Sequence, residues 1–151
     1  MPYSGDVTAR LDRALNPKVV AVVGDKKAMG YMWLHAMKPF TGKLYSVQID
    51  PNEIPGIEAL GVANYKSLLD IPEELDYVLV AVPRNVAPAI VRDCVAKGVG
   101  GAALFTSGFA ETGEPQAIAL QEKIVELATG DGMPIVGPNC MGIYNRRLGL
   151  K

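Results

Sequence analysis

The chain has 151 residues, a net charge of -1, 49% hydrophobic residues and 21% charged residues. These values are ordinary for one soluble globular domain, and a balanced charge without a basic cluster argues against nucleic-acid binding. No apolar stretch approaches the ~20 residues of a membrane helix, and no signal peptide begins the chain. The two cysteines, Cys94 and Cys140, fit neither a disulfide framework nor the CxxC spacing of a zinc site, so we expect a cytoplasmic protein without a bound metal.

The first half of the chain alternates helical and strand patterns. Its apolar residues predict four elements in chain order: a helix at 6–16, a strand at 18–23, a helix at about 30–37 and a strand at 44–49. Pro17 ends the first helix. The β-branched run before Gly24 is typical of a central parallel strand that is covered on both faces.

The second half continues the alternation after a mixed region at 54–75. That region contains a possible short helix near 65–69 and turn signals at Pro72. The remaining pattern predicts a strand at 77–82, a helix at 85–97, a strand at 102–105, a helix at 114–128 and a strand at 135–136.

Strands and helices that alternate with short connections predict an α/β fold. We expect a Rossmann-like, doubly wound parallel sheet of about five strands with helices on both faces. The segmentation predicts an N-terminal helix within residues 1–16 and a single domain over 17–151. No closing element is evident at 146–151, so we expect a domain taken from a longer chain.

The loop from Gly24 to Gly30 follows the first predicted strand. Backbone N–H groups at such a strand-to-helix turn can bind an anion, and two lysines add positive charge. The loop is not the dinucleotide fingerprint, because Lys26 stands where GxGxxG requires its second glycine. A nucleotide-like ligand and an ordinary turn both remain open. Asp50 is similarly open, as an acceptor for a ribose hydroxyl or as part of the Asp50-Pro51-Asn52 turn.

Two further loops rich in glycine and polar residues follow short apolar runs, at 106–114 and at 137–142. Ligands of open α/β sheets bind outside the carboxyl ends of the strands. The two loops are therefore expected to form the walls of a binding site.

Together these motifs resemble the CoA-binding domain of the NDP-forming acyl-CoA synthetases, a superfamily that includes the succinyl-CoA synthetase α chain and ADP-forming acetyl-CoA synthetases. The resemblance covers about residues 16–150. Its most specific parts are the segments 107–113 (SGFAETG) and 137–145 (GPNCMGIYN), and the spacing of Gly24 and Gly30 also fits the family. Supporting matches lie at 61–62, 70–72 and 80–83.

The resemblance implies coenzyme A as the ligand and places its contacts on five segments. The pyrophosphate region would contact Gly24, Lys26, Lys27, Ala28, Met29 and Gly30, and the adenosine would lie near Ile49 and Asp50. The remaining contacts would come from Val82, Pro83 and Arg84, from Thr106, Ser107 and Gly108 beside the pantetheine, and from Asn139 and Cys140 near the thiol end.

Two acidic positions depart from the family pattern. A carboxylate at Asp25 would repel phosphate unless it points away or pairs with a lysine. Glu53 stands at a position that resembles a CoA-contacting lysine of the family. We therefore expect a weakened affinity for CoA.

The resemblance also implies a division of labour. The family reaction passes through a phosphorylated histidine on a following domain, so this chain would act with a ligase domain and an ATP-grasp domain, in cis or in trans. His35 is expected to pack or to face water, Cys94 to lie in the core and Cys140 to be structural or to line the substrate site. On its own the chain is expected to bind CoA without catalysing a reaction, and its oligomeric state, monomer or homo-oligomer, stays open.

Two alternatives stay open at this point. One is a non-catalytic or regulatory CoA-binding module. The other is an NAD(H)-binding, redox-sensing domain, which Asp50 favours and the missing middle glycine opposes.

Overall fold

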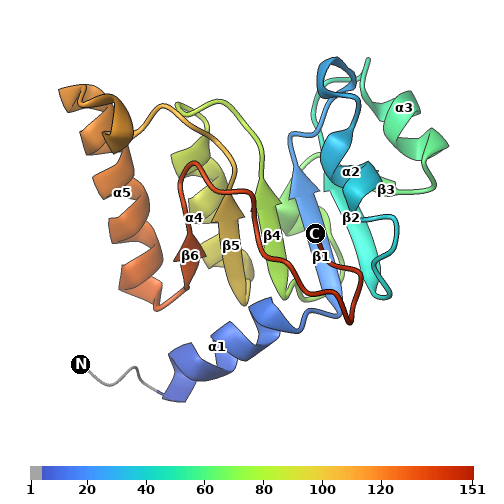
Figure 1. The fold of residues 1–151 in the computed structure, drawn as a ribbon, viewed down its shortest axis with the longest axis horizontal. Coiled ribbons are helices and arrows are strands. Elements are labelled where there is room, and N and C mark those ends of the chain that lie inside the picture. The colour runs from blue at the N-terminus through green and yellow to red at the C-terminus, as the bar shows by residue number, and fades with distance from the viewer. Residues whose placement is uncertain (1–4) are drawn as a thin grey trace.

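The computed structural model describes residues 5–151, and residues 1–4 of the expected N-terminal segment lie outside the described residues. The described residues form a six-stranded, all-parallel sheet with the order β3-β2-β1-β4-β5-β6 (Figure 1). The strands are β1 (Val19–Val23), β2 (Lys43–Val47), β3 (Ala63–Tyr65), β4 (Tyr77–Val80), β5 (Gly101–Leu104) and β6 (Ile135–Val136). This is the strand order of the Rossmann fold, in which the connections reverse direction between β1 and β4.

The described helices lie along the sheet and at its lower end (Figure 1). The α-helices are α1 (Gly5–Leu15), α2 (Met32–Ala36), α3 (Ile54–Ala59), α4 (Ala87–Lys97) and α5 (Pro115–Asp131). Three short 3-10 helices complete the set: η1 (Lys27–Met29), η2 (Leu68–Asp70) and η3 (Ala110–Thr112). No helix among residues 5–151 is long and apolar enough to cross a membrane.

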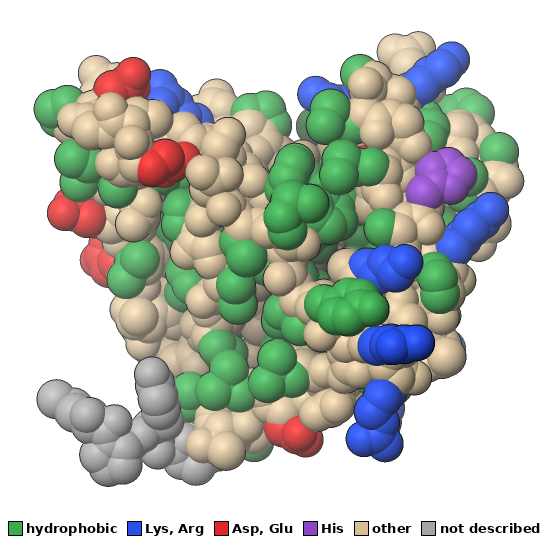
Figure 2. Space-filling view, in the orientation of Figure 1, with side chains coloured by type: hydrophobic (Ala, Val, Ile, Leu, Met, Phe, Trp, Pro, Cys, Tyr) green, Lys and Arg blue, Asp and Glu red, His purple; other side chains and the backbone are tan. Residues whose placement is uncertain are grey.

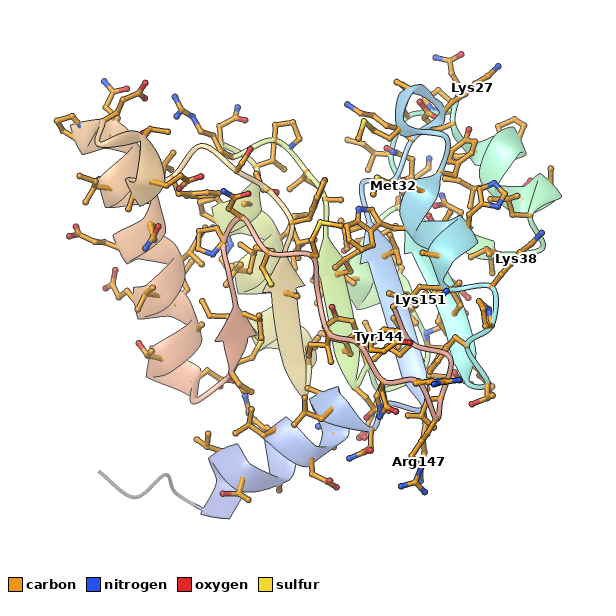
Figure 3. The ribbon with its side chains drawn as sticks, in the orientation of Figure 1. Lys27, Met32, Lys38, Tyr144, Arg147 and Lys151 are labelled. Atoms are coloured by element: carbon orange, nitrogen blue, oxygen red, sulfur yellow. The ribbon has the colours of Figure 1, made fainter. Side chains whose placement is uncertain are left out.

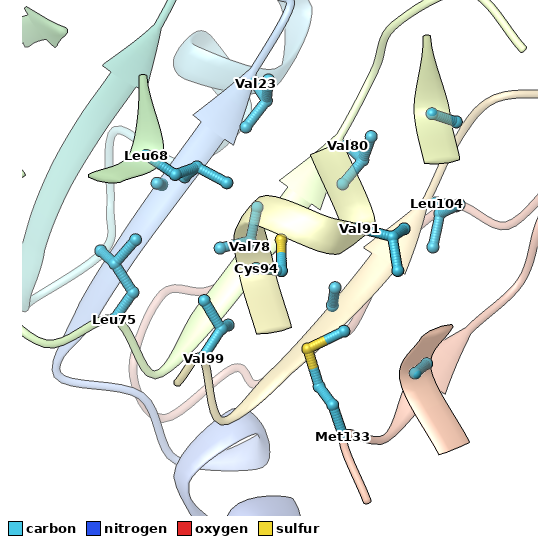
Figure 4. Close-up of a cluster of buried hydrophobic side chains, with 14 of the residues drawn as sticks. Val23, Leu68, Leu75, Val78, Val80, Val91, Cys94, Val99, Leu104 and Met133 are labelled. Atoms are coloured by element: carbon cyan, nitrogen blue, oxygen red, sulfur yellow. The ribbon is translucent and has the colours of Figure 1, made fainter. Parts of the chain in front are cut away.

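Both faces of the sheet are covered, as the continuous apolar strands predict. Successive side chains of a strand point to opposite faces. In β4, Val78 and Val80 therefore enter one core cluster, which α4 and α5 cover (Figure 4). Tyr77 and Leu79 enter the other cluster, together with side chains of α2 and α3.

The C-terminal segment helps to cover this second face. After β6 the chain runs back over β5, β4 and β1 (Figure 1). Leu150 is fully buried in the second cluster, and the backbone of Asn145 bonds to it in both directions. This strap, residues 137–150, thus packs against the second cluster, with Leu148 and Leu150 among its contacts.

Helix α1 lies across the amino ends of the strands. Arg13 connects it to the sheet, because its Nε donates to the Asp76 carboxylate at 3.0 Å and its guanidinium also donates to the carbonyl oxygen of Leu75. Asp76 in turn accepts from the backbone N–H groups of Lys18 and Val19, at the start of β1. This polar network fixes the end of the domain opposite the carboxyl ends of the strands.

The fold class agrees with the sequence, but the region 54–75 does not follow the prediction. The sheet has six strands rather than five, because Ala63–Tyr65 pairs with β2 as an edge strand. Three residues are too few to display an alternating pattern. The short helix expected near 65–69 is this strand followed by a 3-10 turn at Leu68–Asp70. Helix α3 lies within the region left mixed by the sequence pattern, and Pro55 stands in its first turn, where proline is well tolerated.

Candidate functional site

A cleft of about 360 Å³ opens at the carboxyl ends of β1, β4 and β5, at the point where the strand order reverses. Figure 2 shows this edge of the molecule notched between the segments around α2 and around α5. Its walls come from the segments that follow four neighbouring strands of the sheet, β1, β4, β5 and β6, as expected for an open α/β sheet. The lining residues are Gly24, Asp25, Lys26, Met29, Met32, Trp33, Ala81, Val82, Pro83, Arg84, Phe105, Thr106, Ser107 and Asn139.

The first glycine loop passes very close to the strand beside it. Gly24 has a φ of +89°, and a Cβ atom there would lie 2.6 Å from the carbonyl oxygen of Ala81. The position therefore requires glycine for both its backbone angle and its contact. Beyond it, Lys26 and Met29 line the cleft, whereas the predicted residues Lys27, Ala28 and Gly30 do not. The Lys27 side chain projects outward from the tip of the loop (Figure 3).

The carboxylate of Asp25 turns into the protein. One oxygen accepts hydrogen bonds from the backbone N–H groups of Trp33 and Leu34, and the other accepts from that of Lys26. Burial raises the pKa of Asp25, against the three backbone hydrogen bonds, which lower it. Asp25 lines the cleft, yet its carboxylate bonds to the start of α2 rather than pairing with a lysine.

Glu53 lies behind the same loop. Its Oε2 accepts a hydrogen bond from the backbone N–H of Lys27 and another from the hydroxyl of Tyr31, each at 2.8 Å. Glu53 does not line the cleft. The second acidic departure from the family pattern is therefore engaged with the protein itself.

The end of β2 contributes no lining residue to the cleft. Ile49 is 73% exposed, and the carboxylate of Asp50 accepts from the backbone and side-chain nitrogens of Asn52. Gln48 connects this turn to the first loop, because its side chain donates to the carbonyl oxygen of Asp25 and accepts from the backbone N–H groups that follow it. The turn interpretation of Asp50 thus accounts for its contacts.

Arg84 connects the two sides of the cleft. It follows Val82 and Pro83 after β4, and all three line the cleft. Its Nη1 donates to the carbonyl oxygen of Gly108 at 2.8 Å and lies 3.2 Å from the carboxylate of Glu114. Both charged side chains are substantially exposed, so this ion pair contributes little to the stability of the fold.

The second loop is held by a carboxylate of its own. Thr106 and Ser107 line the cleft, and the Thr106 hydroxyl donates to the carbonyl oxygen of Val82 at 2.6 Å. Glu111 accepts from the backbone N–H groups of Gly108 and Phe109 at 2.7 and 3.0 Å. These hydrogen bonds lower the pKa of Glu111, and the bond from Gly108 has the largest effect. Gly108 itself is not among the lining residues.

The third loop joins β6 to the strap. The backbone N–H of Asn139 donates to the carbonyl oxygen of Thr106, which brings Asn139 to the cleft. The backbone N–H of Cys140 donates to the carbonyl oxygen of Leu104, and Cys140 does not line the cleft. Of these two predicted residues, only Asn139 joins the other lining residues. Cys94 is fully buried in α4, where burial raises the pKa of its thiol, and His35 is exposed on α2.

Sequence reasoning missed the apolar part of the site. Met32, Trp33, Ala81 and Phe105 line the cleft, and the rings of Trp33 and Phe105 meet edge to face with centroids 5.0 Å apart. Met32 and Trp33 stand in the first turn of α2, directly after the first glycine loop, and that position is the signal that would have found them. The indole nitrogen of Trp33 is buried and has no hydrogen-bond partner among residues 5–151.

The lining residues give the cleft both positive charge and an apolar wall. Lys26 and Arg84 offer positive charge, and the aromatic and methionine side chains offer an apolar wall. The lining residues include neither histidine nor cysteine, so the cleft has no pair of nucleophile and imidazole base. Residues 5–151 hold no cluster of three or more His, Cys, Asp or Glu side chains suited to a metal ion.

Comparisons with known proteins agree with this geometry. A family model described as a CoA binding domain matches residues 18–146. The ADP-forming acetate–CoA ligase of Methanocaldococcus jannaschii is 38% identical over 137 residues, which are 89% of this chain and 18% of that protein. The alpha subunit of the ADP-forming acetate–CoA ligase II of Pyrococcus furiosus is 38% identical over 144 residues, which are 93% of this chain and 30% of that subunit.

A solved structure shows the same fold at comparable identity. The dinucleotide forming acetyl-coenzyme A synthetase 1 of Ca. Korarchaeum cryptofilum, in complex with phosphate and ADP, has a TM-score of 0.81 and 30% identity. The match covers 93% of this chain and 30% of that one. The chain thus spans between 18% and 30% of the length of these three relatives.

Proposed function

This chain belongs to the family of CoA binding domains, and from that premise we propose that it holds CoA for an ADP-forming acyl-CoA ligase. The observation that carries the proposal is the cleft at the strand-order reversal, which joins a cationic side to an apolar wall. CoA has the same division, with a phosphorylated nucleotide at one end and a largely uncharged arm that ends in a thiol at the other. The relatives' names supply the reaction class.

The lining residues would meet the parts of CoA in a definite order. Lys26 and Arg84 would contact the phosphates, because they are the cations at the cleft. Val82, Pro83, Thr106 and Ser107 would lie beside the pantetheine arm, where apolar contacts and hydroxyls suit methylene and amide groups. Asn139 would lie near the thiol end. A cleft of about 360 Å³ is at the small end for ligand sites, so the nucleotide would extend along the surface past it.

The chemistry of acyl transfer would come from partner domains. His35, the single histidine of the sequence, is exposed and does not line the cleft. We therefore infer that a phosphohistidine, a ligase domain and an ATP-grasp domain reside elsewhere, on the same or another polypeptide. The alpha subunit named among the relatives is consistent with a split arrangement. The role of this chain is then to bind CoA and present its thiol.

An NAD(H) site has less support. Its fingerprint needs a glycine at Lys26, and Asp50 is engaged by Asn52 at a turn outside the cleft lining. We expect no measurable NAD⁺ binding.

Calorimetric titration of the purified chain with CoA, dephospho-CoA and NAD⁺ tests the proposal. We expect CoA to bind, dephospho-CoA to bind more weakly, and NAD⁺ not to bind. Binding of NAD⁺ without CoA would overturn the proposal, and so would the absence of any heat at millimolar CoA. A CoA affinity that falls as the salt concentration rises would support phosphate contacts by side-chain cations.

A further inference from the structure

Tyr31 adopts a backbone conformation that L-amino acids usually avoid. Its φ is +47° and its ψ is 44°, in the left-handed region, directly after Gly30 at +64°. For a residue with a side chain this conformation is sterically unfavourable, and it persists only where other contacts enforce it. Such strain at the junction between the first glycine loop and α2 calls for a compensating interaction.

Glu53 supplies that interaction. A single oxygen, Oε2, accepts both the backbone N–H of Lys27 and the hydroxyl of Tyr31 at 2.8 Å, so one atom joins the two ends of the turn. The Tyr31 hydroxyl also lies 3.3 Å from the backbone carbonyl oxygen of Glu53. Burial and the hydrogen bond to Glu53 raise the pKa of Tyr31, so the phenol stays protonated and remains a donor at neutral pH.

The third member of this arrangement is Gly56. A Cβ atom at this position would overlap the hydroxyl and ring of Tyr31. Helix α3 therefore approaches the tyrosine so closely that any larger residue at Gly56 would require the Tyr31 ring to move. Since Glu53 is the residue before α3, the short helix presents both the acceptor and the surface against which Tyr31 packs.

We propose that Glu53 and Tyr31 form a clasp that holds the loop Lys26–Met29 in the shape that binds the ligand's phosphate, so that Glu53 is a positioning residue for Lys26. The loop has two sides. Lys26 and Met29 line the cleft, whereas Lys27 and Glu53 do not, and the Lys27 side chain projects outward (Figure 3). The clasp thus acts from behind the loop, and the inference rests on the proposed CoA site.

The clasp reverses the simplest electrostatic interpretation of Glu53. If its charge merely opposed the phosphate, any neutral replacement would tighten binding. If its oxygen positions the loop, the replacement must keep that oxygen. Because both donors meet on one oxygen atom, glutamine can keep both hydrogen bonds through its amide oxygen while it removes the charge.

Four single variants separate these effects: Glu53→Gln, Glu53→Ala, Tyr31→Phe and Lys26→Met. CoA affinity is measured by calorimetry and the free energy of unfolding by urea. We expect Glu53→Gln to bind within about threefold of the parent protein, and Glu53→Ala and Tyr31→Phe to bind about three- to tenfold more weakly. The double variant Glu53→Ala with Lys26→Met tests positioning, since its loss should fall short of the product of the two single losses.

The outcomes are separable from those of the proposed function. If the parent protein binds CoA and Glu53→Ala binds equally or more tightly, the clasp is overturned and the CoA site stands. Multiplicative losses in the double variant would also overturn it, because a clasp that acts through Lys26 has nothing to position once Lys26 is gone. Failure of the parent protein to bind CoA would instead reject the proposed function. Variants that lose CoA affinity while their free energy of unfolding in urea stays close to that of the parent protein support the positioning role.

Discussion

The carboxylate of Asp25 accepts a 2.9 Å hydrogen bond from the backbone N–H of Leu34. The same oxygen accepts from Trp33, so this acid caps the start of α2. In many nucleotide-binding folds the corresponding N–H groups bind the phosphate of the ligand. Here the protein's own carboxylate holds those of Trp33 and Leu34, so we expect the side-chain cations Lys26 and Arg84 to supply much of the attraction for a phosphate at this cleft.

Replacement of Asp25 by alanine is expected to destabilise the fold. Buried N–H groups that lose their acceptor cost about 1–3 kcal/mol in the free energy of unfolding. Urea unfolding of Asp25→Ala measures the loss. Asp50→Ala is the matched control, because its carboxylate serves an exposed turn, and we expect a change within about 1 kcal/mol. Equal losses in both variants would contradict the capping role.

Lys26 and Lys27 are adjacent and carry the same charge, yet only Lys26 lines the cleft. We expect Lys26→Met to weaken CoA binding about tenfold, the loss expected for a charge-assisted hydrogen bond, and to reduce its dependence on salt. Lys27→Met should have a much smaller effect, because its side chain points outward (Figure 3). Calorimetric titration of both variants with CoA at two salt concentrations tests this prediction. A larger loss for Lys27→Met would show that the loop presents its other side to the ligand.

Gly24 and Gly30 bound the same loop under different constraints. Alanine at Gly24 would meet the carbonyl oxygen of Ala81 and also hold a φ of +89°, whereas a Cβ at Gly30 meets nothing within 4 Å. We expect Gly30→Ala to cost about 1 kcal/mol for the left-handed backbone alone. Gly24→Ala should cost about 3 kcal/mol or more, because backbone atoms of β1 and β4 must separate. Urea unfolding of the two variants should show this order.

The sequence predicted the parts of the molecule that repeat a strong pattern. The long apolar runs at Val19–Val23 and Tyr77–Val80 gave the central strands, and the glycine-rich segments located the walls of the cleft. The edge strand Ala63–Tyr65 escaped because three residues show no period. The strap at 137–150 escaped because extended segments that pack by a few anchors, such as Leu150, have no periodic signature.

Side-chain direction was the other limit. A loop sequence does not say that Lys26 lines a cleft while Lys27 does not, because this depends on the path of the backbone, which is extended at Lys26 and enters a 3-10 helix at Lys27. Similarly, Asp25 and Glu53 read as obstacles to phosphate in one dimension. Their role becomes clear only from the donors that lie near them in the fold. Asp25 accepts from the backbone N–H of Leu34, and Glu53 accepts from that of Lys27.

Glu111 predicts a pH dependence for the second loop. Its pKa is lower in the folded protein than in the unfolded chain, so its ionised form stabilises the fold above the unfolded pKa. This contribution is lost as the pH falls through the folded pKa. We expect the difference in unfolding free energy between the parent protein and Glu111→Gln to be largest near neutral pH and to shrink in acid. Glu122→Gln, an exposed acid on α5, controls for net charge. A difference that is constant from pH 7 to acid would contradict the assignment.

Trp33 gives the cleft an intrinsic optical probe. It is the single tryptophan of the sequence, it lines the cleft, and its ring packs edge to face against Phe105. A ligand arm that contacts this wall changes the polarity around the indole, so we expect CoA to alter the tryptophan emission with the same affinity that calorimetry reports.

Pantetheine, which lacks the nucleotide, should produce the same spectral change at higher concentration, because it would occupy the apolar wall without the phosphate contacts of Lys26. Trp33→Phe removes the signal and keeps an aromatic wall, so binding measured by heat should persist. Saturating CoA that gives heat but leaves the emission of the parent protein unchanged would place the arm elsewhere in the cleft.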